Sequence, residues 1–158
     1  MSRATPRTDM IIRELSAGQC QAVLMANRLA RLACARDGQP YAVPIFYAFA
    51  EGCAYAFTMP GRKLETMRAN PNVALLIEQN SADLCWKSVV AEGRFEELPG
   101  GVGFHPERDH AWSLLSAHAN WWEPGALRPI SPPLADRSSH VFFRIRIERI
   151  SGRAAVEE

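Results

Sequence analysis

Two glycine-containing turns, Asp37-Gly38 and Glu51-Gly52, divide residues 29–58 into three short segments rich in apolar side chains. Asp-Gly is a strong signal for a two-residue hairpin, because both turn positions then adopt positive φ angles. We therefore expect three consecutive antiparallel strands, over residues 29–35, 41–48 and 53–58. Strands joined this tightly indicate an antiparallel sheet folded into a barrel or a sandwich.

The middle segment, residues 41–48, is largely apolar on both faces of the expected strand. The two alternating sets are Tyr41, Val43, Ile45 and Tyr47 on one face and Ala42, Pro44, Phe46 and Ala48 on the other. Two apolar faces are typical of a strand that lies between a core and an interface. Proline cannot donate to a β-ladder, so Pro44 indicates an edge, a bulge or a gap in the ladder.

The rest of the chain predicts small helices inserted between further strands. Ser16 and Gln19 fit a capping box at the start of a helix over residues 16–26. Asn70-Pro71 ends a second helix over residues 62–69. The other expected elements are strands over 73–78, 86–98 (with a bend at Gly93) and 140–150, a helix over 104–118, and loose tails at 1–10 and 153–158. We expect one mainly β domain over residues 1–158, a closed antiparallel barrel with a sandwich as the competing architecture.

Composition and charge exclude several classes of protein. The chain has 158 residues, 47% apolar and 22% charged, which is typical of a globular domain. A formal charge of +1 favours neither nucleic acid nor an anionic membrane as a partner. No two cysteines lie closer than fourteen positions, so no Cys-x-x-Cys motif is present. Since residues 1–10 do not resemble a signal peptide and no run of eighteen apolar residues occurs, we expect a cytoplasmic protein.

Gly61-Arg62-Lys63 places two cations on the first turn of the expected helix over residues 62–69. The unpaired N–H groups and the positive dipole end of a helix N-terminus favour an anion. Cations are slightly unfavourable there unless a negative ligand accompanies them. A phosphate would satisfy all of these groups, with the Thr58 hydroxyl beside it. The alternative is that Arg62 and Lys63 form a solvated helix start.

Five motifs are informative together: Val-Pro-Ile-Phe-Tyr from residue 43, Phe-Thr from 57, Gly-Arg-Lys-Leu from 61, Arg-Ala-Asn-Pro from 68 and Trp-Lys-Ser-Val-Val-Ala-Glu-Gly from 86. They resemble the pyridoxamine 5'-phosphate oxidase-like flavoproteins, in particular the branch that includes nitroimidazole-resistance proteins. The resemblance covers residues 11–98 well and residues 140–153 more loosely. It implies a six-stranded split barrel that forms a homodimer and binds two FMN molecules between its protomers.

The resemblance also implies roles for individual residues. Arg62 and Lys63, next to Gly61, would bind the FMN phosphate. The residues expected along the isoalloxazine ring, partly through main-chain groups, are Val43, Pro44, Ile45 and Phe46. Those expected beside the ribityl chain are Phe57 and Thr58. Ser88 would reach the flavin across the dimer.

Two departures from the family concern the substrate. The true oxidase has Gln at the position of Ser88, and its C-terminal Arg-x-His signature is only partly matched by Arg144-Ile145-Arg146. Pyridoxamine 5'-phosphate is therefore a poor candidate, and we expect another small-molecule substrate. Residues 104–139 are the expected site of selectivity. Trp121 and Trp122 would either stack on a bound ring or plug the barrel end or dimer seam.

The sequence identifies no catalytic side chains and leaves the cofactor open between three groups. Its four histidines lack metal-ligand spacing, so no metal site is expected. Haem and a deazaflavin, both used by relatives of this fold, are the alternatives to FMN. One function that fits is an FMN-dependent oxidoreductase passing two electrons from NAD(P)H, or a similar reductant, to a small acceptor. The other is a flavin- or haem-binding carrier or sensor without turnover.

Overall fold

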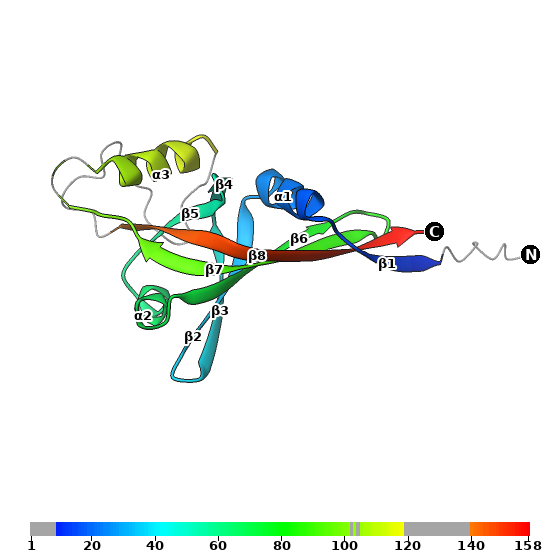
Figure 1. Ribbon diagram of the computed structural model, residues 1–158, viewed down its shortest axis with the longest axis horizontal. Helices are drawn as coiled ribbons and strands as arrows, with labels where there is room; N and C mark the ends of the chain where they lie inside the picture. Colours follow the sequence, from blue (N-terminus) through cyan, green and yellow to red (C-terminus); the bar gives the residue numbers. More distant parts are fainter. Residues whose placement is uncertain (1–8, 102, 104, 119–139) are drawn as a thin grey trace, which may run out of the picture.

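The structure, a computed structural model, describes residues 9–101, 103, 105–118 and 140–158. Its strands form an antiparallel sheet in the order β3-β2-β6-β7-β8-β5-β4, and β1 pairs with β8 off this path (Figure 1). The elements in chain order are β1 (Met10–Glu14), α1 (Ala17–Ala26), β2 (Leu29–Arg36), β3 (Gln39–Phe46), β4 (Ala48–Ala50), β5 (Cys53–Thr58), α2 (Arg62–Ala69), β6 (Asn72–Asn80), β7 (Trp86–Glu97), α3 (Pro106–Ser116) and β8 (Val141–Glu157).

The sheet is open, because no ladder joins β3 to β4 among the described residues. This architecture is the antiparallel split barrel that the resemblance implied. The closed barrel expected from the strand pattern alone is wrong, and so is the two-sheet sandwich. Short strands β1 and β4, of five and three residues, add to the six longer ones. Strand β3 lies at the end of the sheet, where the missing N–H of Pro44 is tolerated.

Both predicted hairpin turns are present. Asp37 and Gly38 have φ angles of 51° and 74°, and Glu51 and Gly52 have φ angles of 54° and 74°. Two consecutive positive φ angles are typical of the type I′ turn, whose twist matches the strands on either side. These turns close the β2–β3 and β4–β5 hairpins.

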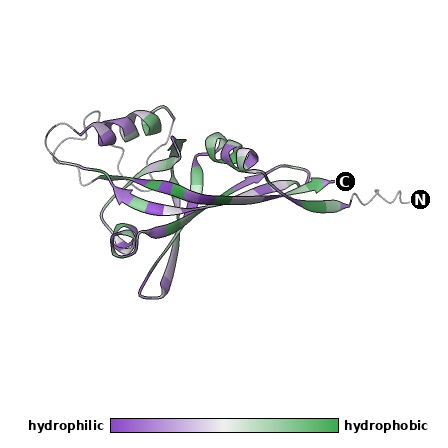
Figure 2. Cartoon of the chain, viewed as in Figure 1, coloured by the Kyte–Doolittle hydropathy of each residue, from purple (hydrophilic) through white to green (hydrophobic). Residues whose placement is uncertain are grey.

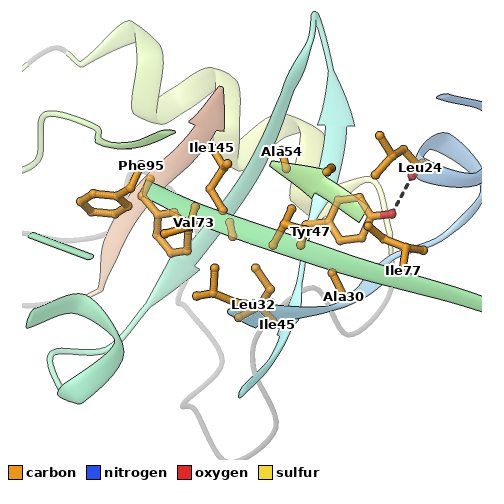
Figure 3. Close-up of a cluster of buried hydrophobic side chains, with 14 of the residues drawn as sticks. Leu24, Ala30, Leu32, Ile45, Tyr47, Ala54, Val73, Ile77, Phe95 and Ile145 are labelled. Atoms are coloured by element: carbon orange, nitrogen blue, oxygen red, sulfur yellow. Dashed lines mark hydrogen bonds between the residues drawn. The ribbon is translucent and has the colours of Figure 1, made fainter. Parts of the chain in front are cut away.

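Tyr47 interrupts the strand predicted over residues 41–48, so four strands replace the expected three. β3 ends at Phe46 and β4 begins at Ala48. Between them the Tyr47 ring enters the core, where it is 1% exposed and its hydroxyl donates to the Leu24 carbonyl at 2.8 Å (Figure 3). Burying a phenol requires such a partner, and this one ties α1 to the sheet.

Two groups of apolar side chains stabilise the sheet. The larger one includes Leu32, Ile45 and Ile145, which converge from three strands (Figure 3). The smaller one packs beneath α3 and includes Phe57 and Phe142. Hydrophobic and hydrophilic residues alternate along β7 and β8 in Figure 2, so each strand directs one face to the interior.

The three predicted helices are confirmed, with small changes of boundary. Ser16 and Gln19 form the reciprocal capping box of α1. α2 spans residues 62–69 and ends before Pro71, as predicted. α3 is shorter than predicted, because it begins with Pro106, a residue suited to the first turn of a helix. In the view of Figure 1, α1 and α3 lie above β8, whereas α2 lies below it.

The C-terminal tail that was expected to be loose, residues 153–158, contains β structure, and of the expected N-terminal tail Met10 belongs to a strand. β8 continues to Glu157 instead of ending at residue 150, and β1 begins at Met10. Residues 153–157 pair with β1, and residues 153–155 also pair with β7, so this end of β8 is held on two sides. Such pairing between distant segments leaves no local pattern in the sequence, which explains why the C-terminal tail was misassigned.

Gly93 lies at the predicted bend. The β7–β8 register shifts between Glu92 and Gly93, where β8 contributes Glu148 as an extra residue.

None of the helices in the described parts of the chain is long and apolar enough to cross a membrane. All four cysteines are free thiols.

Candidate functional site

A hollow of about 360 Å³ lies where the end of β5 turns into α2 beside the edge strand β3. We call it the α2 hollow. Its lining residues are Tyr41, Val43 and Pro44 from β3, Thr58, Met59, Pro60 and Gly61 from the turn, and Arg62 and Lys63 from α2. Six of the ten cofactor-binding residues predicted from the sequence therefore meet at one place.

The backbone of the α2 hollow presents a helix N-terminus. Gly61 precedes the helix and has no side chain with which to cap it. The first helical hydrogen bond that follows runs from the Glu65 N–H to the Gly61 carbonyl, at 3.1 Å. The N–H groups before Glu65 therefore have no carbonyl partner within the helix, and this arrangement favours a bound anion.

Arg62 is exposed and lies over an aromatic ring. Its guanidinium carbon is 4.3 Å from the centroid of the Tyr41 ring, a favourable cation–π distance. None of the ion pairs among the described residues involves Arg62. Its donors therefore remain available for an acidic ligand in the α2 hollow.

Lys63 differs from Arg62 in being buried, with 8% of its surface exposed. Burial penalises the charged ammonium and lowers the pKa of Lys63 to about 8. The neighbouring residues Leu64 and Met67 pack into the core, which fixes the helix that carries Lys63. A negative ligand bound in the α2 hollow would interact favourably with this ammonium.

Cys34 lies opposite Tyr41, a lining residue of the α2 hollow, in the β2–β3 ladder. Its Sγ is 3.7 Å from the Tyr41 carbonyl oxygen, to which the thiol donates. Burial raises the pKa of the Cys34 thiol, an effect that Lys63 and Arg62 oppose. The thiol therefore serves as a packed, protonated group and not as a nucleophile.

Three of the other predicted site residues are buried or partly buried away from the α2 hollow. Ile45 lies in the main core, and Phe46 is half-buried at the end of β3. Phe57 packs against Phe142, with ring centroids 5.9 Å apart, in the cluster beneath α3. Trp121 and Trp122 lie outside the described residues.

Ser88 lines a different hollow, of about 430 Å³, with Val90 and residues of β1, β8 and the turn after β1. Within one chain it is not brought together with Arg62. Ser88 and Val90 belong to an exposed sheet surface, which we call the outer face. It comprises the side chains of β3, β2, β6 and β7 that point away from the core: Ala42, Pro44, Phe46, Leu29, Arg31, Ala33, Ala74, Leu76, Glu78, Ser88, Val90 and Glu92.

Three residues of the α2 hollow were absent from the predicted set. Tyr41 shares a strand face with Val43, which the resemblance placed along the flavin ring, so the two-residue period of the strand could have added Tyr41 to the set. Met59 and Pro60 lie between the predicted residues Thr58 and Gly61, and this position in the turn is the only sequence signal that could have identified them as lining residues.

The donor set of the α2 hollow fits a phosphate. Two cations and a helix N-terminus converge there, and charge-assisted hydrogen bonds to phosphate are among the strongest in proteins. The adjoining Val43 and Pro44 offer an apolar edge for the rest of such a ligand. A riboflavin 5'-phosphate group combines an anionic phosphate with an apolar ring system, and so matches both parts of this hollow.

Known proteins resemble this chain over nearly its whole length. A sequence model of the family described as pyridoxamine 5'-phosphate oxidase matches residues 16–154. An uncharacterised protein of Rhizobium meliloti (strain 1021) is 49% identical over 146 residues, which are 92% of this chain and 97% of that protein. The crystal structure of an FAD-binding protein from Mesorhizobium loti has 53% identity and a TM-score of 0.77, over 92% of this chain and 99% of that one.

The fold alone is shared with a candidate 5-nitroimidazole antibiotic resistance protein from Bacteroides thetaiotaomicron, with a TM-score of 0.69 and 14% identity over 98% of this chain and 96% of that one. These similarities confirm the resemblance inferred from the five motifs. By the extent of the matched region and the identity to its relatives, the chain belongs to the pyridoxamine 5'-phosphate oxidase-like split-barrel family.

Proposed function

We propose that this protein is a flavin-dependent oxidoreductase that holds the 5'-phosphate of riboflavin in the α2 hollow. The convergence of Arg62, Lys63 and the start of α2 at one hollow carries this proposal. The FAD-binding relative from Mesorhizobium loti supports a flavin. FMN and FAD share the riboflavin 5'-phosphate, so both fit the same chemistry, and the four free thiols suit a reducing cytoplasm.

The residues of this chain bind and orient the cofactor. A bound flavin supplies transfer of two electrons from NAD(P)H, or a similar reductant, to a small acceptor. Arg62 and Lys63 would bind the phosphate, while Val43 and Pro44 at the edge of β3 would lie along the apolar part. Substrate selectivity would reside in residues 104–139, the part of the chain between β7 and β8 that includes α3, because segments connecting the elements of a rigid scaffold often supply binding residues.

The absorbance spectrum of the purified protein, with mass analysis of the released cofactor, tests the proposal. Flavin bands that bleach with NADPH and return with an acceptor are the expected result, and the released mass separates FMN from FAD and from a deazaflavin. Flavin bands that do not respond to any reductant would instead support a carrier or sensor. A Soret band and released haem would contradict the flavin assignment.

We further propose that the protein is a homodimer whose second copy covers the outer face. The register aligns apolar residues across four strands: Phe46 opposite Leu29, Ala42 opposite Ala33, Ala33 opposite Ala74 and Leu76 opposite Val90. Val90 is 38% exposed and Leu29 is 44% exposed within one chain. Stable dimers bury about 2,000 Å² or more of such surface. A second copy would also bring Ser88 toward a flavin held by the first.

Val90→Arg is expected to convert the dimer into a monomer and to weaken FMN binding. The substitution places a cation on the outer face, and Val90 is exposed enough that the fold of one chain tolerates it. Light scattering and FMN titration measure the two effects. Met25→Arg on α1, at a residue 61% exposed, is the matched control and should change neither. If light scattering showed that the flavin-bound wild type is a monomer, the proposed dimer would be wrong.

FMN affinity is expected to fall as the pH rises above about 8. Burial lowers the pKa of Lys63 to about 8, so the cation is present below this pH and is lost above it. Binding then requires uptake of a proton, and affinity decreases by up to about tenfold per pH unit. Titrations between pH 7 and pH 9.5 measure the slope. Lys63→Arg, which stays charged, should flatten the profile, and an unchanged slope in that variant would contradict a role for Lys63.

A further inference from the structure

We propose that Tyr41 is a positioning residue of the phosphate site, because its ring holds the Arg62 guanidinium where the flavin phosphate binds. The proposal rests on the function assigned above to the α2 hollow. Tyr41 and Arg62 both line this hollow, and the guanidinium carbon lies 4.3 Å from the ring centroid. At this distance the negative face of the ring attracts the cation.

Arg62 needs such a support because of its place in the chain. It is the first residue of α2, it is exposed, and it forms no ion pair with the described carboxylates. A free arginine side chain carries about 2 kcal/mol of rotamer entropy, which binding must remove. Stacking on Tyr41 removes part of this entropy before the phosphate arrives, which is how preorganisation increases affinity.

Tyr41 is itself held in place by β2. It lies directly opposite Cys34 in the β2–β3 ladder, and the buried Cys34 thiol donates to the Tyr41 carbonyl at 3.7 Å. α2 rests on the same core, since Leu64 and Met67 share a cluster with Leu32 and Cys34. Core contacts therefore fix both the Tyr41 ring and the helix that carries Arg62. The distance between the ring and this helix does not depend on the turn that precedes α2.

A competing role for Tyr41 is direct stacking on the flavin ring. The two roles differ in which part of the ligand they affect. A ring that positions Arg62 contributes only through the phosphate, so it matters for FMN and not for riboflavin. A ring that stacks on the isoalloxazine contributes equally to both ligands. Comparing the two flavins therefore separates the roles.

The test is titration of the full-length, flavin-free protein with FMN and with riboflavin, for wild type and Tyr41 variants. Tyr41→Leu is expected to weaken FMN binding about three- to thirtyfold and to leave riboflavin binding unchanged. Tyr41→Phe retains the ring face and should bind FMN as wild type does. Tyr41→Met, which keeps apolar volume without a ring, should behave like Tyr41→Leu. In an Arg62→Ala background, Tyr41→Leu should cause no further loss.

Equal losses of FMN and riboflavin would overturn the positioning role in favour of stacking on the flavin. Unchanged FMN binding in Tyr41→Leu and Tyr41→Met would overturn any role for the ring. Failure of the proposed function has a separate signature, because wild type would then bind FMN no more tightly than riboflavin, whatever residue is present at position 41.

Discussion

Arg62→Ala and Lys63→Ala are each expected to weaken FMN binding about ten- to a hundredfold. A charge-assisted hydrogen bond contributes about 1.5–3 kcal/mol, and each cation can make at least one to a phosphate in the α2 hollow. Arg62→Ala should have at least as large an effect as Lys63→Ala, because a guanidinium can bind two phosphate oxygens whereas an ammonium acts as a point charge.

Riboflavin is the control ligand for these variants, since it lacks the phosphate. It should bind weakly to the wild type and respond little to either substitution. Titration of flavin-free protein with both ligands, followed by fluorescence or calorimetry, gives the comparison. Equal loss of both flavins would indicate damage to the fold, and unchanged FMN binding would place the phosphate elsewhere.

Lys63→Met distinguishes a loss of FMN binding from a loss of folding stability more clearly than the alanine variants do. The pKa of Lys63 is about 8 in the folded chain and 10.5 in an unperturbed lysine, so below pH 8 the buried charge destabilises the flavin-free fold. This penalty fades as the pH rises from about 8 toward 10.5. At pH 7, Lys63→Met should therefore raise the free energy of unfolding by about 1–3 kcal/mol while FMN affinity falls. A variant that is more stable yet binds FMN poorly cannot owe its loss to misfolding.

The sequence predicted those parts of the fold that local chemistry determines. The Asp37-Gly38 and Glu51-Gly52 turns, the Ser16 cap and the Asn70-Pro71 stop each act over a few residues, and each is present. The pairing of residues 153–157 with β1, and of residues 153–155 with β7, depends on segments far apart in the chain. Tyr47 lies between β3 and β4, and its hydroxyl donates to a carbonyl of α1, a contact that no strand period can indicate.

In the candidate site, too, the features that depend on neighbouring residues were predicted, whereas those that depend on contacts between distant residues were not. Gly61, Arg62 and Lys63 are consecutive, so the sequence alone predicted that they would place two cations at the start of a helix. The contact between Tyr41 and Arg62 joins residues of two different elements and appears only in the folded chain. Ser88 and Phe57 were assigned by resemblance to the family, and within one chain they lie away from the α2 hollow.

Gly93→Ala is expected to destabilise the protein more than any other single methyl addition at a described glycine. A Cβ at position 93 would overlap the Arg146 carbonyl oxygen and would lie 3.0 Å from the Ile145 side chain. The oxygen belongs to the backbone of β8, which pairs with β7 and β5 and cannot shift alone. Gly93 also adjoins the register shift at Glu92, where β8 accommodates its extra residue. The strain would therefore fall on the ladder at the centre of the sheet.

The expected loss is about 2–4 kcal/mol of unfolding free energy, or roughly 4–16 °C in Tm for a chain of this size. Urea and thermal unfolding at one protein concentration measure it, because a dimer's stability depends on concentration. Gly18→Ala is the matched control. A Cβ at Gly18 meets nothing within 4 Å, and the residue lies in α1, where alanine should stabilise by about 0.5–1 kcal/mol. If Gly93→Ala unfolded like the wild type, β8 would have to move away from β7 at the bulge, and the close approach at this bend would not be a requirement of the fold.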